Sequence, residues 1–175
     1  MKKNKIGLKN DYVELVVNSK DWCGLYSTEE KKITKQLSDK ILQIEHIGST
    51  SIKKIKAKPI IDILVVVEDG FIEDEITSQL EKIGYEKGLF QRQGEIFYLK
   101  SKDDIHYYYI HLVSKSNDWE RYILFRDCLN SNIVIAKKYE KLKLDLAEQF
   151  SDNRSKYTSS KENFVEKTLL KLRKR

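Results

Sequence analysis

The chain has 175 residues, which is long enough for one well-filled hydrophobic core. Its 40% hydrophobic content and ten tyrosines predict a folded protein, and no apolar run approaches the roughly 20 residues that a membrane span needs. The first residues lack the apolar segment of a signal peptide, so a cytoplasmic protein is expected. Two distant cysteines, Cys23 and Cys128, indicate neither a disulfide framework nor a thiolate zinc site, and both are expected to be buried or half-buried.

The formal charge of +6 comes from 33 basic and 27 acidic residues. Such a charge favours anionic partners, including nucleotides, phosphates and RNA. Much of the excess lies at the two ends of the chain, where charged runs are usually solvated tails. No RNA-binding motif accompanies the charge, so a small phosphorylated ligand is a better expectation than nucleic acid. The oligomeric state is left open.

Hydrophobic periodicity predicts alternating strands and helices in the first two thirds of the chain. The run at 60–67 is rich in β-branched residues and apolar on both faces, which is typical of a central strand covered on two sides. Four elements are expected before it: a strand at 14–17, a helix at 28–42, a strand at 43–47 and a short helix from about 51. Four segments are expected after it: a helix at 72–83, an irregular stretch at 84–94, and strands at 95–100 and 105–113 around the turn SKDD.

From residue 118 onward the pattern is entirely helical. Three helices are expected, at 118–129, 133–150 and 159–172, with Asp118 and Ser159 as N-caps. The predicted fold class is therefore α+β. A single domain over 1–175 would place a mixed-sheet core at about 12–115 before a bundle of C-terminal helices at about 118–172.

The stretch EHIGSTSIKKIKAKPIIDILVVV, residues 45–67, indicates an anion site. A strand that ends at Gly48, with Ser49 and Thr50 before a short helix, presents backbone N–H groups and two hydroxyls. Lys58 and three other lysines of the following loop add positive charge. An ordinary glycine turn with a Ser/Thr cap explains the same letters, so the turn alone does not decide between the two.

Asp62 lies within the central strand, on one face with Leu64 and Val66. An ionised carboxylate there is costly unless it is paired, hydrogen-bonded or bound to a metal. His111 is the best candidate partner, because alternation along YYYIHLV places it on the more polar face of its strand; it would complete a divalent-metal site or carry a proton. A salt bridge from Asp62 to a lysine, and a hydrogen-bonded core histidine, are the structural alternatives.

The other two histidines are weaker candidates. His46 stands two residues before Gly48 and is a further candidate metal ligand, whereas His106 lies beside a turn and is expected to be exposed.

The C-terminal helices each place one cation within an apolar stripe: Arg126, Lys143 and Lys161. A lone case is usually a snorkelling side chain at the edge of a core. Three cations that converge on a cleft lined by Asp62 would instead form a phosphate-binding wall.

These blocks, together with YIHLV, WERYILFRDCL, YEKLKLDLA and YTSSKENFV, resemble the GrpB family over about residues 12–170. That family, found alone and fused to some dephospho-CoA kinases, is similar to the nucleotidyltransferase superfamily. The resemblance implies a nucleotidyltransferase-like mixed sheet, with Gly48 and Ser49 in the nucleotide-gripping turn and Asp62 as the second acid of an Asp-x-Asp pair. In the superfamily, three carboxylates hold two magnesium ions that align a triphosphate for attack. Here Ile60 replaces the first acid, and His111 lies on the strand that would supply the third.

Two functions follow from this resemblance. The first is an enzyme that transfers a nucleotidyl or other phosphate-linked group to a small acceptor, with Asp62 and His111 catalytic or bound to Mg²⁺ or Mn²⁺. The second is a non-catalytic module that binds a nucleotide or CoA-like ligand in the same cleft. The residues expected to bind phosphate or substrate are shared by both: Gly48, Ser49, Thr50, Lys58, Arg126, Lys143 and Lys161.

Overall fold

The computed structural model describes residues 6–89 and 93–174, and its centre is a six-stranded mixed sheet. The strands are β1 (Leu8–Lys9), β2 (Ile41–Ile47), β3 (Ile61–Val67), β4 (Glu86–Lys87), β5 (Glu95–Lys102) and β6 (Ile105–Ser114). They follow the order β2-β3-β6-β5-β4, with β1 beside the start of β6. Only the β3–β6 pair is parallel among these strands. The predicted α+β class with a mixed sheet is confirmed.

The β3 strand forms the middle of the core because it is apolar on both faces. Ile61, Ile63 and Val65 pack beneath α1 (Asp21–Leu37) and α2 (Glu73–Glu81). Leu64 and Val66 point to the opposite face and contact aromatic side chains near the start of α3 (Glu120–Ser131). Burial on both sides removes a continuous β-branched surface from water, which is the main source of stability for such a strand.

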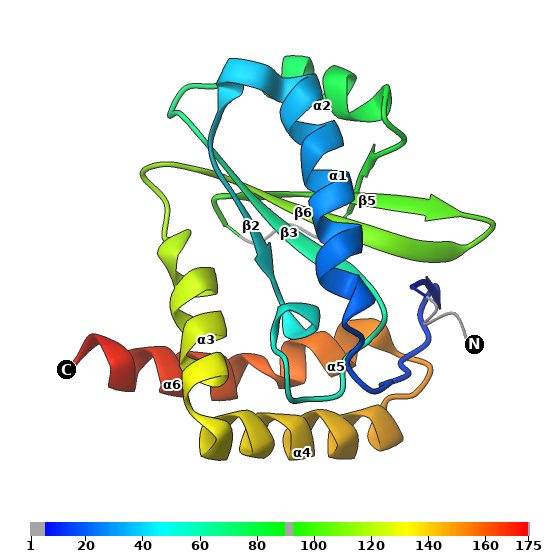
Figure 1. Ribbon diagram of the computed structural model, residues 1–175, viewed down its shortest axis with the longest axis vertical. Helices are drawn as coiled ribbons and strands as arrows, with labels where there is room; N and C mark the ends of the chain where they lie inside the picture. The colour runs from blue at the N-terminus through cyan, green and yellow to red at the C-terminus, as the bar shows by residue number, and fades with distance from the viewer. Residues whose placement is uncertain (1–5, 90–92, 175) are drawn as a thin grey trace.

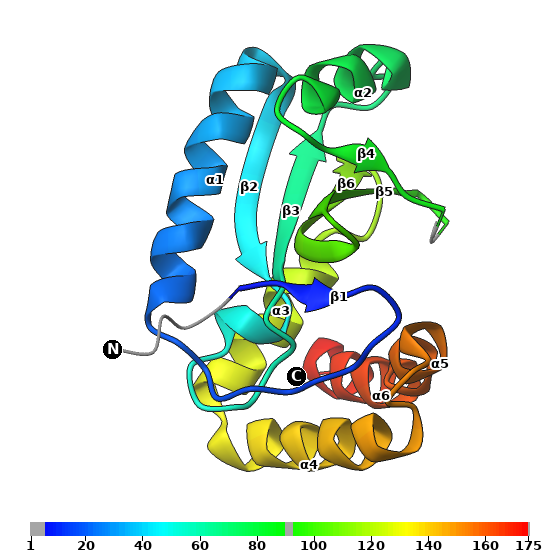
Figure 2. The same cartoon turned by 90° about the vertical axis from the view of Figure 1, so that its right-hand side faces the viewer.

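The last three helices gather at one end of the sheet. They are α4 (Ile133–Gln149), α5 (Arg154–Ser160) and α6 (Glu162–Arg173), and Figure 1 shows them grouped below the strands, away from α2. Figure 2 shows the same group from the side, with α4 outermost and α1 running along the sheet. The start of β3, which carries Asp62, therefore lies at the end of the sheet that these helices cover.

Several predicted element boundaries in the first half of the chain are wrong. Residues 14–17 form no strand, and only an isolated bridge joins Val16 to Ala57. The first helix spans Asp21–Leu37 instead of 28–42: buried Trp22 draws residues 21–27 onto the sheet as an N-terminal extension, and the positive φ of Ser38 ends the helix early. Two short 3-10 turns, Ser38–Lys40 and Ser49–Ser51, flank β2. The stretch expected to be irregular contains β4, and its residues 90–92 lie outside the described part of the chain.

The predicted helix caps are also wrong. Asp118 precedes Trp119, the N-cap of α3, and its carboxylate binds Arg173 at 2.5 Å. Ser159 lies inside α5, since the helix expected from 159 is in fact two helices that meet at Lys161.

Two further burial predictions fail. Cys23 is exposed, whereas Cys128 is buried as expected. His106, expected at the surface, is half-buried, with its Nδ1 2.8 Å from the Tyr109 hydroxyl. No helix in the described ranges is long and apolar enough to cross a membrane.

Candidate functional site

The turn after β2 closes directly over Asp62. Gly48 has φ +67°, a conformation that favours glycine, and a Cβ added at this position would lie 2.1 Å from Asp62 Oδ2. The register explains the contact, because Ile47 pairs with Asp62 across the β2–β3 ladder. Ser49 follows in the same turn and interacts with Tyr139 of α4. The predicted association of the Gly-Ser turn with Asp62 is thus present as a backbone-to-carboxylate contact.

The predicted proximity of Asp62 and His111 is also present. Leu64 pairs with His111 across the parallel β3–β6 ladder, which places Asp62 and His111 on the same face. The Nε2 atom of His111 lies 3.6 Å from Asp62 Oδ1. Its Nδ1 atom lies 2.5 Å from Oε1 of Glu95, a buried side chain on β5. We call Asp62, His111 and Glu95 the acid–histidine chain.

The acid–histidine chain fixes the charge of its central ring. Burial lowers the pKa of His111, but hydrogen bonds and charge interactions with Asp62 and Glu95 outweigh burial and raise that pKa to about 9. The imidazole is therefore cationic at neutral pH. The Tyr122 hydroxyl of α3 donates a hydrogen bond to the second carboxylate oxygen of Glu95, which holds the far end of the chain in place.

Three lysines interact through their charges, and two of them, Lys58 and Lys161, also interact with Asp62; we call Lys58, Lys143 and Lys161 the lysine cluster. The ammonium groups of Lys58 and Lys161 both lie over the Tyr157 ring, 5.4 Å and 4.5 Å from its centre. Lys143 is almost fully buried, lies 5.1 Å from the Tyr139 ring centre, and donates a hydrogen bond to the carbonyl of Lys56. Three of the predicted phosphate ligands are thus brought together.

Burial, with a smaller effect of like charge on Lys58 and Lys143, lowers the pKa of every lysine in the cluster. Burial, and then the charge of Lys161, lowers the pKa of Lys143 to about 7. Burial lowers the pKa of Lys161 itself to about 8, against the opposing charge of Asp62. The pKa of Lys58 is lowered well below its ordinary value by burial and by Lys161. Within 6–89 and 93–174, no carboxylate forms an ion pair with these three lysines.

The remaining predicted site residues are engaged elsewhere. Arg126 donates to Glu45 Oε2 at 2.6 Å and to the carbonyl of His46 at 3.0 Å, so it fastens α3 to β2. The Thr50 hydroxyl lies 2.9 Å from Nε2 of His46, which keeps both side chains inside the fold. His46 pairs with Ile63 and so projects from the face opposite Asp62, where it stacks on Tyr26. Burial lowers its pKa to about 4.

These positions do not fit the two-magnesium arrangement of the superfamily. Magnesium takes oxygen ligands, and of the three acids only Asp62 is present, with Ile60 and His111 at the other two positions. The carboxylate of Glu95 is already bonded to His111 and Tyr122. In the described part of the chain, no group of three or more His, Cys, Asp or Glu side chains is placed to hold a metal.

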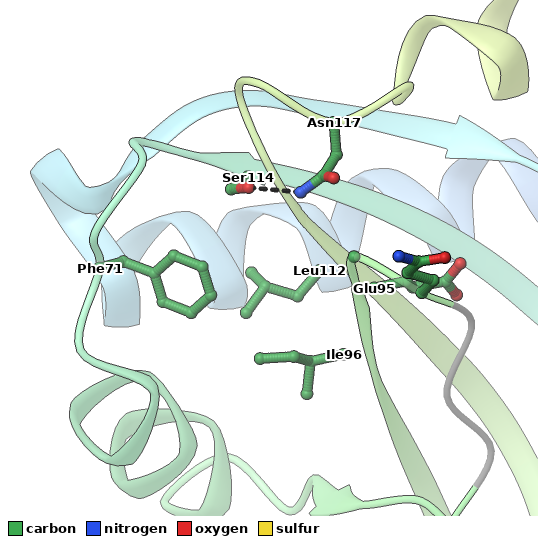
Figure 3. Close-up of a pocket in the computed structure, with 8 residues that line it drawn as sticks. Phe71, Glu95, Ile96, Leu112, Ser114 and Asn117 are labelled. Atoms are coloured by element: carbon green, nitrogen blue, oxygen red, sulfur yellow. Dashed lines mark hydrogen bonds between the residues drawn. The ribbon is translucent and has the colours of Figure 1, made fainter.

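A separate pocket of about 420 Å³ lies near the start of β5 (Figure 3). Its lining includes Phe71, Ile96 and Leu112, with a hydrogen bond between Ser114 and Asn117 at its rim. The pocket is largely apolar and contains neither Asp62 nor any member of the lysine cluster. It shares only Glu95 with the acid–histidine chain.

Sequence reasoning missed Glu95, Tyr122 and the two tyrosines beneath the lysines. Glu95 begins a predicted strand. That it lies on the same face of the sheet as His111 follows only from the β5–β6 register, which pairs Phe97 with His111. Tyr139 and Tyr157 occupy apolar stripe positions, where an aromatic side chain is ordinarily part of a core. The signal that could have revealed their role is the lysine four residues after each of them, Lys143 and Lys161.

Comparison with known proteins gives the fold a context. A solved structure of the conserved protein GrpB from Enterococcus faecalis superposes with a TM-score of 0.78 at 33% identity, covering 88% of this chain and 93% of that one. Cid1 poly(U) polymerase with Mg 3′-dATP bound superposes at 0.51 and 13% identity, over 77% of this chain and 42% of that chain. The second likeness shows a shared nucleotidyltransferase fold.

Relatives in sequence agree with this placement. A glutamate-rich protein GrpB from Alkalihalophilus pseudofirmus is 35% identical over 94% of this chain and 98% of its own length. The UPF0157 protein YqkA of Bacillus subtilis is 31% identical over 87% of this chain, which spans only 45% of that longer protein. The profile of the family described as GrpB protein matches residues 12–171. The chain therefore belongs to the GrpB family.

Proposed function

We propose that the site around Asp62 binds the phosphate groups of a small nucleotide or CoA-like ligand. One observation carries the proposal: the ammonium groups of Lys58 and Lys161 both lie over the Tyr157 ring. Among the described residues, neither of them forms an ion pair with a carboxylate. Two cations held this close repel each other, and a phosphate between them would remove the repulsion and restore their ordinary affinity for protons.

The exposure of these groups assigns them different roles. Lys58, Lys161 and Ser49 are half-buried, so part of each residue is open to solvent. Lys143 is 1% exposed and already bonded to the Lys56 carbonyl, so its contribution is to hold the loop that presents Lys58. Arg126, paired with Glu45, is not needed for this binding.

The test is a screen of nucleoside triphosphates and CoA compounds by thermal shift and calorimetry, repeated on Lys161→Ala. Loss of a charge-assisted hydrogen bond is expected to weaken binding by about tenfold to a hundredfold. Lys167→Ala is the matched control, because it removes the same charge from an exposed position on the neighbouring helix and should bind like the wild type. Absence of binding by every phosphate compound would contradict the proposal.

Group transfer is a second candidate, favoured by the contact between Asp62 and the Gly48 turn within a nucleotidyltransferase fold. The hydroxyl oxygen of an acceptor would attack the α-phosphorus of a triphosphate, pyrophosphate would leave, and Asp62, with 26% of its side chain exposed, would take the hydroxyl proton.

Pyrophosphate release tests this second candidate, with a low-molecular-weight cell extract as the source of acceptor. Transfer predicts release by the wild type that is lost in Asp62→Asn and kept in Asp145→Asn, a matched change at an exposed position of α4. If the protein binds phosphate compounds but releases no pyrophosphate, the proposed binding function stands and the proposed group transfer is contradicted.

A further inference from the structure

We infer that the Asp62 site binds phosphate groups without a divalent metal, with Lys58 and Lys161 supplying the positive charge that magnesium supplies elsewhere in the superfamily. The inference rests on the proposed phosphate binding and adds how that binding is achieved. It follows from three features of the site: the engagement of His111, the surroundings of Asp62 and the source of the counter-charge.

The first feature is that both ring nitrogens of His111 face carboxylates. Nδ1 lies 2.5 Å from Glu95, which is hydrogen-bond distance, and Nε2 lies 3.6 Å from Asp62. A histidine binds a metal through a lone pair that points into open space beside the other ligands. Here the ring instead bridges two acids, and Glu95 is held in turn by Tyr122.

The second feature is that both carboxylate oxygens of Asp62 already have neighbours in the fold. One oxygen packs against the backbone of Gly48, and the other faces His111. Lys58 and Lys161 act on the same carboxylate through their charges. A divalent ion bound there would be repelled by the two ammonium groups, and of the three acid positions of the superfamily only Asp62 would offer a carboxylate to offset that repulsion.

The third feature is that the lysines make a metal unnecessary. In a metal-dependent site the ion neutralises the triphosphate, and the protein supplies mostly carboxylates. In this site the balance is reversed, since two lysines act through their charges on one acid, Asp62, which packs against Gly48. The ligand's own phosphate groups would therefore complete the charge balance.

Calorimetry with inorganic tripolyphosphate tests the inference directly. With EDTA present the wild-type protein is expected to bind, and millimolar Mg²⁺ should weaken the binding several-fold, because Mg²⁺ neutralises the ligand before it reaches the lysines. Binding that requires Mg²⁺, or tightens by about tenfold or more when it is added, would overturn the inference while leaving the proposed phosphate function intact. Failure to bind under either condition would instead remove the proposed function, and this inference with it.

Electron paramagnetic resonance of Mn²⁺ supplies an independent readout that needs no phosphate ligand. The expected result is an unchanged free-ion signal on addition of the protein. A bound signal in the wild type that is lost in Asp62→Asn would overturn the inference, because it would show that Asp62 holds a metal. Asp145→Asn is the matched control, since it removes a carboxylate from an exposed helix position.

Discussion

The contact between Gly48 and Asp62 shows how a single backbone conformation sets up the site. The positive φ of Gly48 turns the chain so that its Cα rests against the carboxylate, and any side chain would occupy the space of Oδ2. Alternation predicted that His111 lies on the more polar face of its strand, and the β3–β6 register shows that this is also the face of Asp62. The role of Gly48 in packing against the acid required the β2–β3 register.

Gly48→Ala is expected to destabilise the fold by about 1 to 3 kcal/mol, since it combines a strained φ with a methyl group 2.1 Å from a carboxylate oxygen. Chemical denaturation measures the change. Gly24→Ala is the control: Gly24 lies inside α1 with nothing near its added Cβ, so the same substitution should stabilise by about 0.5 to 1 kcal/mol. Equal effects at the two positions would contradict the steric account.

The raised pKa of His111 predicts a pH-dependent stability. The folded pKa of about 9 exceeds the ordinary 6.5, so the folded state holds an extra proton between these values. The contribution is fully present below pH 6.5 and is lost as the pH rises through 9. Relative to His111→Gln, the wild type should lose on the order of 2 to 3 kcal/mol of unfolding free energy over this window, measured by urea denaturation.

Lys143→Met controls for general effects of pH, because the contribution of Lys143 to stability should change with pH in the direction opposite to that of His111. The pKa of Lys143 falls from 10.5 to about 7 on folding, so the unfolded state holds the extra proton. The wild type should therefore gain stability relative to Lys143→Met as the pH rises above 7. Trends of the same sign in the two comparisons would contradict the assigned charges.

At the scale of elements, periodicity predicted the interior of each major segment better than its ends. The β3 run and α4 are recognisable because their apolar spacing extends over many residues. The early turn of α1 was missed because Trp22 packs onto the sheet, a tertiary contact that local pattern does not contain. The break at Lys161 was missed for a similar reason, since the apolar spacing continues through it.

The same limit explains which site residues were predicted. Lys143 lies in the apolar stripe of α4, so its helical phase directs it inward, whereas Lys161 lies at the junction of α5 and α6 although the apolar spacing continues through it. Arg126 has an equivalent phase, but its guanidinium meets Glu45 across 81 positions of sequence. A partner so distant in the chain cannot be inferred from periodicity.

Asn132 is expected to be the cap that fixes the start of α4. Its side chain accepts hydrogen bonds from the backbone N–H groups of Val134 and Ile135, both at 3.1 Å. Asn132→Ala should cost about 1 kcal/mol in thermal or urea unfolding. Ser159→Ala, at the position that the sequence favoured as a cap but that lies within α5, should change stability by no more than about 0.5 kcal/mol. A larger cost at Ser159 than at Asn132 would reverse this assignment.

At the scale of the whole molecule, Arg154 joins the two ends of the described chain. Its guanidinium donates to the carbonyls of Lys9 and Tyr12 near the N-terminus, and to the Tyr109 hydroxyl at 2.6 Å in the sheet. The side chain belongs to α5, so one buried cation holds an N-terminal segment, a central strand and the C-terminal helices together. Tyr109 pairs with Asp62 across β3 and β6, which connects this junction to the site.

Arg154→Ala is expected to cost about 2 to 4 kcal/mol, because it leaves a buried hydroxyl and two part-buried carbonyls without their donor. Arg154→Lys should recover less than half of the loss, since one ammonium group cannot reach all the acceptors that the planar fork reaches. Lys156→Ala, an exposed position on the same helix, should be neutral. Urea denaturation measures the stabilities, and limited proteolysis should cut the segment around Tyr12 faster in Arg154→Ala. If stability falls while that segment stays protected, Arg154 supports its own helix and does not hold the two ends of the chain together.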